Sequence, residues 1–234
     1  MHFIHTRHGF SLIEIMIALV VSSILTAGIY EIFHTQQNTH RAQDEVVKMQ
    51  QNMRGGLYLL ARDLRSAGFD PNDSNAFGFV VNMPKVGGGN LFPTDIDYTI
   101  DTNRIALSLD NNGNGAVDDN NNERIAYRLN NTILERYNSN APDPTQMWEP
   151  IIDNVDALDF VYLDANGNVL ATNDPAQIRA VQVSLLVRTG KVDRRYTNNT
   201  TVYLNKQGQN ICPTCQNDHH RRRLMTSTIH IRNL

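Results

Sequence analysis

The sequence predicts an α+β protein in which one long N-terminal transmembrane and amphipathic helix packs on an antiparallel β-sheet domain. An apolar run from Phe10 to Tyr30 leads directly into helical sequence, and the segments after Gly68 alternate between apolar and polar residues. The content of 41% hydrophobic and 19% charged residues is that of a folded chain. With 234 residues, the chain has room for one ordinary domain plus an appended element.

The apolar run carries a single charge, Glu14. At ~1.5 Å per residue, Phe10–Tyr30 is long enough to cross a bilayer of ~30 Å. A secretory signal peptide would be cut after its apolar stretch, at a small-residue site, and no such site follows Tyr30. A plain membrane anchor is the stronger alternative. However, an acidic residue costs ~2.5 kcal/mol or more at the centre of a spanning helix, so Glu14 indicates a functional role.

The predicted helix continues beyond the apolar run to Ser66, where Ser66-Ala67-Gly68 and then Asp70-Pro71 form a stop signal. Gly28 and the pair Gly55-Gly56 are positions where it could bend. Its second half has an apolar stripe with steps of three and four residues. The stripe consists of Val46, Met49, Met53, Leu57, Leu60 and Leu64.

The rest of the chain predicts strands separated by Asn, Asp and Gly turns. Their apolar faces are expected to pack on the helix stripe, and we find no internal repeat and no long linker. The predicted strands are Arg104–Leu109, Arg124–Leu129, Thr132–Tyr137, Val155–Leu163, Ile178–Arg188 and Leu224–Arg232.

The hexapeptide Gly9-Phe10-Ser11-Leu12-Ile13-Glu14 resembles the prepilin cleavage motif of type IV pilins and type II secretion pseudopilins. The resemblance implies cleavage between Gly9 and Phe10 by prepilin peptidase, followed by N-methylation of Phe10. It also implies that Glu14, then the fifth residue, pairs with the Phe10 α-amino group of a neighbouring subunit during assembly. Each charge is tolerable in a low-dielectric bundle only with the other present.

Three further segments, 60–71, 155–164 and 221–229, are similar to PilW-type minor pilins and the related J-type pseudopilins. This resemblance implies a pilin fold and a minor type IV pilus subunit that helps to prime or cap assembly. Its implied partners are minor and major pilins, through the N-terminal helix, and prepilin peptidase. The implied location is a single-pass inner-membrane protein with a periplasmic head, and then a surface pilus. A J-type pseudopilin of a type II secretion system is the alternative.

These features predict four regions along the chain. Residues 1–9 are expected to be the leader peptide and residues 10–31 the transmembrane half of the helix. Residues 32–68 are expected to be its amphipathic periplasmic half, and residues 69–234 the β-rich head.

The segment 110–118, Asp-Asn-Asn-Gly-Asn-Gly-Ala-Val-Asp, fits the first nine positions of a calcium loop. The twelfth position is Asn121, so Glu123 would have to supply the usual carboxylate from a stretched loop. The alternative is a solvated turn that binds nothing. A calcium-dependent adhesive module on a pilin anchor is a further functional alternative. The expected ligands are Asp110, Asn112, Asn114, the Ala116 carbonyl, Asp118 and Glu123.

The only two cysteines, Cys212 and Cys215, predict a short-loop disulfide in an extracytoplasmic domain. A zinc site that adds His219 and His220 is a weaker alternative, because adjacent histidines seldom both bind one ion. Thioredoxin-like chemistry would need the pair at the start of a helix in a βαβ unit, and the sequence context does not fit this.

The net charge of −3 argues against nucleic acid as the main partner, because phosphate binding needs a basic face. The cluster Arg221-Arg222-Arg223 could serve DNA uptake, but a solvated run at the start of a strand is the favoured interpretation. No catalytic motif or binding motif for an organic cofactor is visible. The chain is therefore predicted to be a substrate of an enzyme and not an enzyme itself.

Overall fold

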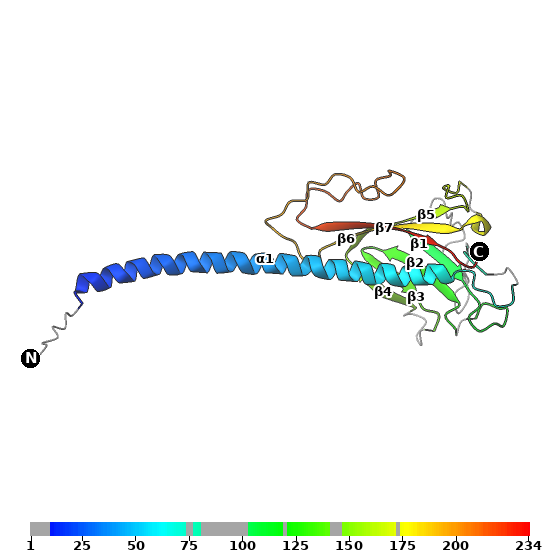
Figure 1. Ribbon diagram of the computed structural model, residues 1–234, viewed down its shortest axis with the longest axis horizontal. Helices are drawn as coiled ribbons and strands as arrows, with labels where there is room; N and C mark the ends of the chain where they lie inside the picture. Colours follow the sequence, from blue (N-terminus) through cyan, green and yellow to red (C-terminus); the bar gives the residue numbers. More distant parts are fainter. Residues whose placement is uncertain (1–9, 74–76, 81–102, 119–120, 141–146, 172–173) are drawn as a thin grey trace, which may run out of the picture. The chain divides into compact units, whose positions relative to one another are not determined.

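The computed structural model describes residues 10–73, 77–80, 103–118, 121–140, 147–171 and 174–234 (Figure 1). The chain divides into two compact units, one that ends at Asp44 and one that runs from Glu45 to Leu234. The described residues form one long α-helix followed by antiparallel strands, which confirms the predicted α+β class.

Helix α1 spans Leu12–Ser66 and contains no break at Gly28 or at Gly55-Gly56. It ends where predicted. Gly68 takes a left-handed φ of 72°, and its N–H donates to the Ser108 carbonyl at 3.1 Å. The Leu234 side chain lies where a Cβ at this position would be, so the turn needs glycine for both its conformation and its space.

The strands form two antiparallel sheets where the sequence predicted one sheet. The four-stranded sheet has the order β1-β2-β3-β4 and the three-stranded sheet the order β5-β6-β7. Asn154 alone separates β4 from β5 and has a φ of 61°, so the chain passes between the sheets at a single left-handed residue. The strands are β1 Arg104–Ser108, β2 Arg124–Asn130, β3 Ile133–Tyr137, β4 Trp148–Asp153, β5 Val155–Leu163, β6 Ala180–Arg188 and β7 Arg222–His230.

Strand β4 was not predicted, because Pro150 and the neighbouring pair Ile151-Ile152 hide its alternation. The structure accommodates the proline since β4 lies at the edge of its sheet. Pro150 pairs with Glu135 next to a register shift in β3, where a missing ladder donor is tolerated. The other six strands agree with the predicted segments to within two residues at each end.

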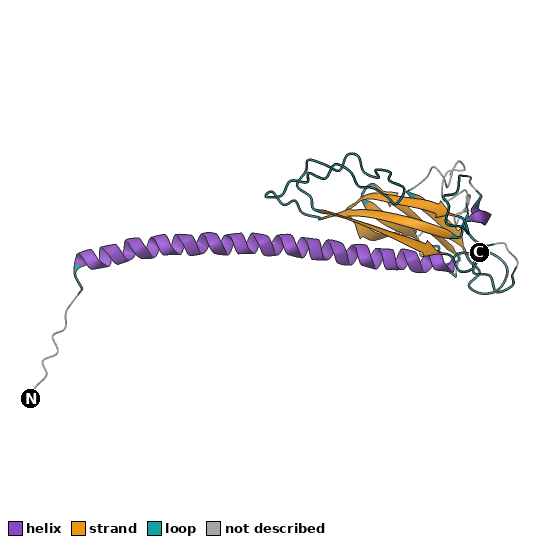
Figure 2. Ribbon diagram, turned by 45° about the horizontal axis from the view of Figure 1, so that its top comes forward, coloured by secondary structure: helices purple, strands orange, loops and turns teal. Residues whose placement is uncertain are grey.

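One apolar core in the second unit joins the helix stripe to both sheets. Figure 2 shows the strands gathered along the C-terminal part of the helix. Met53, Leu60 and Leu64 are fully buried in this core, and Val46 packs at its margin. The strand residues of the core include Ile105, Leu107, Ile125, Tyr127, Leu134, Ile152, Phe160, Val181, Val183, Leu185 and Ile229.

A buried carboxylate lies within this helix–sheet contact. Asp63, 3% exposed, accepts hydrogen bonds from the Tyr127 hydroxyl at 2.8 Å and from Arg136 Nε at 2.7 Å. Arg62 bonds its other oxygen at 2.9 Å. Burial and the Asp63 carboxylate together raise the pKa of Tyr127, so this hydroxyl stays a donor. The network fixes α1 to β2 and β3 through directional contacts.

The other face of the three-stranded sheet is covered by the segment 189–221, which runs between β6 and β7. Ala157, Leu186 and Leu224 lie in register across the three strands on this face. The buried Asp159 accepts a hydrogen bond from Asn205 at 2.9 Å, and burial raises the pKa of its carboxyl group. The apolar residues that cover the face from this segment are Tyr203, Ile211, Cys212 and Cys215.

Candidate functional site: the start of helix α1 and the other predicted sites

The first turn of α1 is closed by a capping box. The Ser11 N–H donates to Glu14 Oε2 at 2.8 Å, and the Glu14 N–H donates to Ser11 Oγ at 3.3 Å. This reciprocal pair satisfies two N–H groups that a helix start leaves unpaired. The carboxylate is therefore held at the amino end of the helix, beside Phe10.

A shallow groove of about 390 Å³ begins at the same end of the helix. Glu14 Oε1 accepts no hydrogen bond from any described residue, so this oxygen is available to another donor. A carboxylate at the mouth of an apolar groove is a suitable site for an ammonium group that arrives with an apolar side chain. The residues that line the groove are Phe10, Glu14, Ile15, Ala18, Leu19 and Ser22.

The apolar side chains of the first unit from Phe10 to Phe33 are all exposed to solvent in the isolated chain. Leu12 is 77% exposed, Ile24 67% and Ile29 67%. Among the described residues, α1 is the one helix with a segment long and apolar enough to cross a membrane. Gly9, the predicted cleavage residue, lies outside the described residues, and Phe10 is the first residue described.

The predicted calcium loop is organised around two buried carboxylates, Asp110 and Glu123. Asp110 accepts hydrogen bonds from the backbone N–H groups of Gly113, Asn114 and Gly115 at 2.6–3.2 Å. Glu123 accepts N–H bonds from Asn111, Asn112 and Asp118 at 2.6–3.2 Å. Glu123 therefore folds back over the loop that Asp110 begins.

The remaining predicted ligands lie on the exposed side of this loop. The side-chain amides of Asn112 and Asn114 both donate to Asp118 Oδ2 at 2.8 Å. The Ala116 N–H donates to Asn114 Oδ1 at 2.8 Å. Protein donors therefore bond both buried carboxylates, and the described residues contain no group of three or more His, Cys, Asp or Glu side chains arranged to hold a metal ion.

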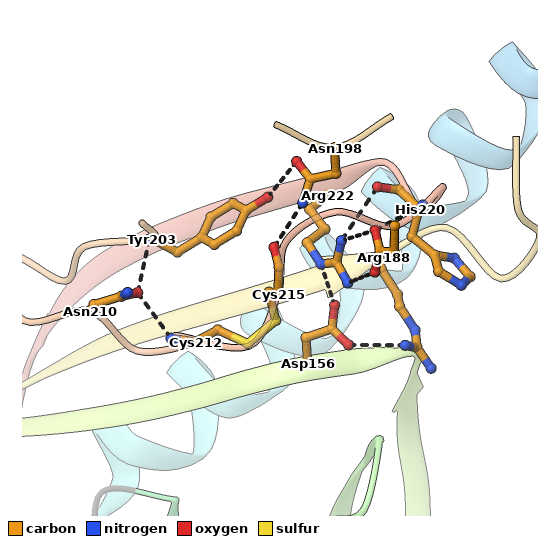
Figure 3. Close-up of a disulfide and its surroundings, with 10 residues drawn as sticks. Asp156, Arg188, Asn198, Tyr203, Asn210, Cys212, Cys215, His220 and Arg222 are labelled. Atoms are coloured by element: carbon orange, nitrogen blue, oxygen red, sulfur yellow. Dashed lines mark hydrogen bonds and ion pairs between the residues drawn. A yellow bond between two sulfur atoms is a disulfide. The ribbon is translucent and has the colours of Figure 1, made fainter. Parts of the chain in front are cut away.

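Cys212 and Cys215 form the predicted disulfide. The bond uses both sulfur atoms and so excludes the alternative Cys₂His₂ zinc site in this state. His219 Nδ1 lies 2.6 Å from the Tyr196 carbonyl, and His220 Nδ1 lies 2.9 Å from the Thr189 carbonyl. Figure 3 shows the disulfide beside Asn198, whose side-chain amide donates to the Cys215 carbonyl at 2.8 Å.

The interpretation of the triple-arginine cluster as a solvated run was wrong. Arg222, with a side chain only 3% exposed, bonds Asp156 through Nε at 2.6 Å (Figure 3). Its two terminal nitrogens both bond Asp218, each at 2.6 Å. Arg221 pairs with Asp193 at 2.8 Å. The Arg222 bonds lower the pKa of Asp218 to about 2. Carboxylates of the folded chain therefore pair two of the three cations.

Two family models match this chain, one at the helix start and one over most of the rest. The model of the prokaryotic N-terminal methylation motif matches residues 4–30, and the model of prepilin peptidase-dependent protein B matches residues 42–211. The solved structure of the type IV-like pilin TTHA1219 from Thermus thermophilus matches with a TM-score of 0.47 and 14% sequence identity. The match covers 79% of this chain and 97% of that one. No curated protein matches this sequence.

The methylation motif at the head of a long apolar helix, followed by an antiparallel head, defines a type IV pilin-like protein. Since the second family model matches more than half of the sequence, the chain belongs to the prepilin peptidase-dependent protein B family. Its processing by prepilin peptidase and its anchoring through the N-terminal helix follow from the two family models together.

Proposed function

We propose that this chain is a minor subunit of a type IV pilus that helps to prime or cap pilus assembly. The observation that carries the proposal is the groove at the start of α1. There, Phe10 and Glu14 lie together at the start of the helix segment 10–33, whose apolar side chains are exposed. Before assembly the helix is held in the inner membrane with the head in the periplasm. After assembly it packs among the helices of minor and major pilins.

Glu14 is the residue through which this proposal is tested most directly. Cleavage after Gly9 turns Phe10 into the chain start, and its α-ammonium group gains a place beside the free Glu14 oxygen of a neighbouring subunit. Glu14→Ala is expected to leave cleavage intact but to lower incorporation into filaments. Glu14→Gln is the matched variant, because it keeps a capping acceptor and loses only the charge.

The decisive measurement is mass spectrometry of the N-terminal peptide from sheared surface filaments and, separately, from membranes. N-methylated Phe10 in the sheared filaments supports a pilus subunit. The same peptide confined to membranes favours the J-type pseudopilin. An unprocessed N-terminus in both fractions would remove the basis of the proposal, and so would normal incorporation of both Glu14 variants.

Calcium binding at the loop 110–123 stays a prediction, and the position of Glu123 supports it. The Glu123 carboxylate accepts hydrogen bonds from the backbone N–H groups of Asn111 and Asn112, so it lies over the start of the loop as a closing ligand would need. Carboxylate and carbonyl oxygens are the donors that Ca²⁺ prefers, with affinities of roughly 10⁻⁴–10⁻³ M in extracellular modules.

The calcium prediction is tested by titrating the full chain in detergent and measuring its thermal midpoint. Calcium is expected to raise the midpoint of the wild type and not that of Asp118→Asn, which leaves every backbone bond to Asp110 and Glu123 in place. Asp164→Asn, in another Asn- and Gly-rich turn, is the control. If chelation also abolished adhesion while filaments still assembled, the calcium-dependent adhesive module would be the better description.

A further inference from the structure

The half of α1 that belongs to the second unit has a second face, directed away from the core. We call it the outer helix face. Its members follow one another in steps of three or four residues, apart from the adjacent pair Arg54 and Gly55, and all are exposed. Tyr58, at its centre, is 72% exposed, and Val47 is 50% exposed. The outer helix face consists of Val47, Gln51, Arg54, Gly55, Tyr58, Arg62 and Arg65.

The two adjacent glycines of this helix have different surroundings. Gly56 is buried, and a Cβ there would collide with the Ile152 side chain, so the contact with β4 requires a glycine. Gly55 lies on the outer helix face, and a Cβ there would meet no atom within 4 Å. Glycine in a helix interior costs roughly 1 kcal/mol relative to alanine. No contact of the described chain accounts for that cost at Gly55.

The charge on the outer helix face is of one sign. Arg54 and Arg65 have no carboxylate partner among the described residues. The two acidic residues of this helix half are paired within the chain, and of the outer helix face only Arg62 bonds one of them, Asp63, at 2.9 Å. Glu45 lies 3.8 Å from Lys191, and Asp63 is buried against Tyr127 and Arg136. The face therefore combines free cations and an exposed aromatic ring with a position that lacks a side chain.

We propose that the outer helix face is a docking site for an acidic helix of a neighbouring pilin-like subunit. The partner backbone approaches closely at Gly55, because a missing side chain lets two helices pack at short distance. Tyr58 covers the contact, and carboxylates on the partner pair with Arg54 and Arg65. We favour a helix over an anionic lipid surface because lipid headgroups would pair with the arginines whether or not position 55 carried a side chain. Close approach of a second helix, in contrast, depends on the missing side chain of Gly55. The proposal rests on the assignment of the chain as a filament subunit.

The adjacent glycines supply a matched pair of variants with opposite expected effects. In the full-length protein in detergent, Gly55→Ala is expected to raise the thermal midpoint slightly, and Gly56→Ala to lower it because of Ile152. Incorporation of Gly55→Ala into sheared filaments is expected to fall about tenfold, the loss that about 1.4 kcal/mol of contact energy produces. A fall in assembly together with higher stability cannot come from misfolding.

Two further variants test the chemistry of the partner. Arg54→Glu with Arg65→Glu and, separately, Tyr58→Ala should reduce incorporation, while Val202→Ala, which removes another exposed apolar side chain, should not. A photocrosslinker at Gln51 should capture a second pilin-like chain in the membrane fraction.

The proposal would be overturned by normal incorporation of Gly55→Ala and of the arginine pair, or by crosslinks to lipid alone. A wild type that enters no filament and meets no pilin-like chain would instead contradict the filament assignment itself.

Discussion

The apolar residues of α1 before Asp44 and those of the core-facing stripe after Glu45 have opposite surroundings. Ile24 and Leu25 are 67% and 61% exposed, whereas Leu60 and Leu64 are fully buried by strands of their own chain. Both sets have helical spacing, and both favour removal from water by roughly 25 cal/mol per Å². Apolar side chains on α1 therefore have two different roles in this molecule. In the first unit the apolar side chains are left for partners outside the chain under the proposed function, and in the second unit the core-facing stripe stabilises the fold.

This contrast predicts different effects for substitutions in the two units. Substitutions in the first unit should change processing and assembly without changing the unfolding of the head. Substitutions of buried residues in the second unit should change the unfolding of the head and leave processing unchanged. The four predictions below test this division, from the largest expected effect to the smallest.

A bulky residue in place of Gly9, such as Gly9→Leu, should abolish processing, because the peptidase motif requires the small residue before Phe10. The protein should then remain a full-length membrane species in mass spectrometry, with an unchanged denaturant midpoint of the head. Cleavage at the normal rate would contradict the assignment of the motif.

Asp63→Ala should lower the free energy of unfolding by about 3–5 kcal/mol, because it leaves Arg136 as a buried cation without its partner. Denaturant titration of the full-length protein in detergent measures the change. Tyr127→Phe removes one hydrogen bond and should cost about 1 kcal/mol. A loss for Asp63→Ala no larger than that for Tyr127→Phe would mean that the charge pair does not hold helix to sheet.

Replacing Cys212 and Cys215 together by serine should cost about 2 kcal/mol, because the closed loop is short and its cross-link removes little unfolded-state entropy. Calorimetry should show a lower thermal midpoint, and reduction of the wild type should reproduce it. N-terminal processing should be normal, since the disulfide lies in the second unit. Defective cleavage in this variant would contradict the expectation that processing in the first unit is independent of stability in the second.

Acidification should weaken the attachment of the segment 189–221 through Asp218. The Arg222 bonds hold the pKa of Asp218 at about 2 in the folded chain, below the ordinary value of ~3.9. Its stabilising contribution is therefore complete above pH ~4 and is lost as the pH falls through about 2. Solvent screening keeps the effect below about 1 kcal/mol. Asp218→Asn should flatten the decline of stability over this range, and an unchanged curve would contradict the linkage.

The sequence alone predicted the elements whose signals are local. The helix from the apolar run to Ser66 is one example, because its spacing and its glycine stop are carried by neighbouring residues. The disulfide Cys212–Cys215 is another, since only two cysteines were available. Six of the seven strands, separated by Asn, Asp and Gly turns, were predicted for the same reason, although their division into two sheets was not. Strand β4 was missed because Pro150 contradicts a strand unless the strand is known to lie at an edge.

The tertiary structure decided which charged residues are structural. Asp63 stands between Leu60 and Leu64 on the apolar stripe, and that position was the one signal in the sequence for a buried carboxylate. Nothing local pairs Arg222 with Asp156, which is 66 residues away. In the sequence, Gly55 and Gly56 are indistinguishable members of a flexible pair. The structure shows that the fold requires Gly56, because of its contact with Ile152, and does not require Gly55. The periodicity of a sequence determines which residues share a face. Only the tertiary structure determines whether that face is buried by strands of the same chain, because those strands come from segments distant in sequence.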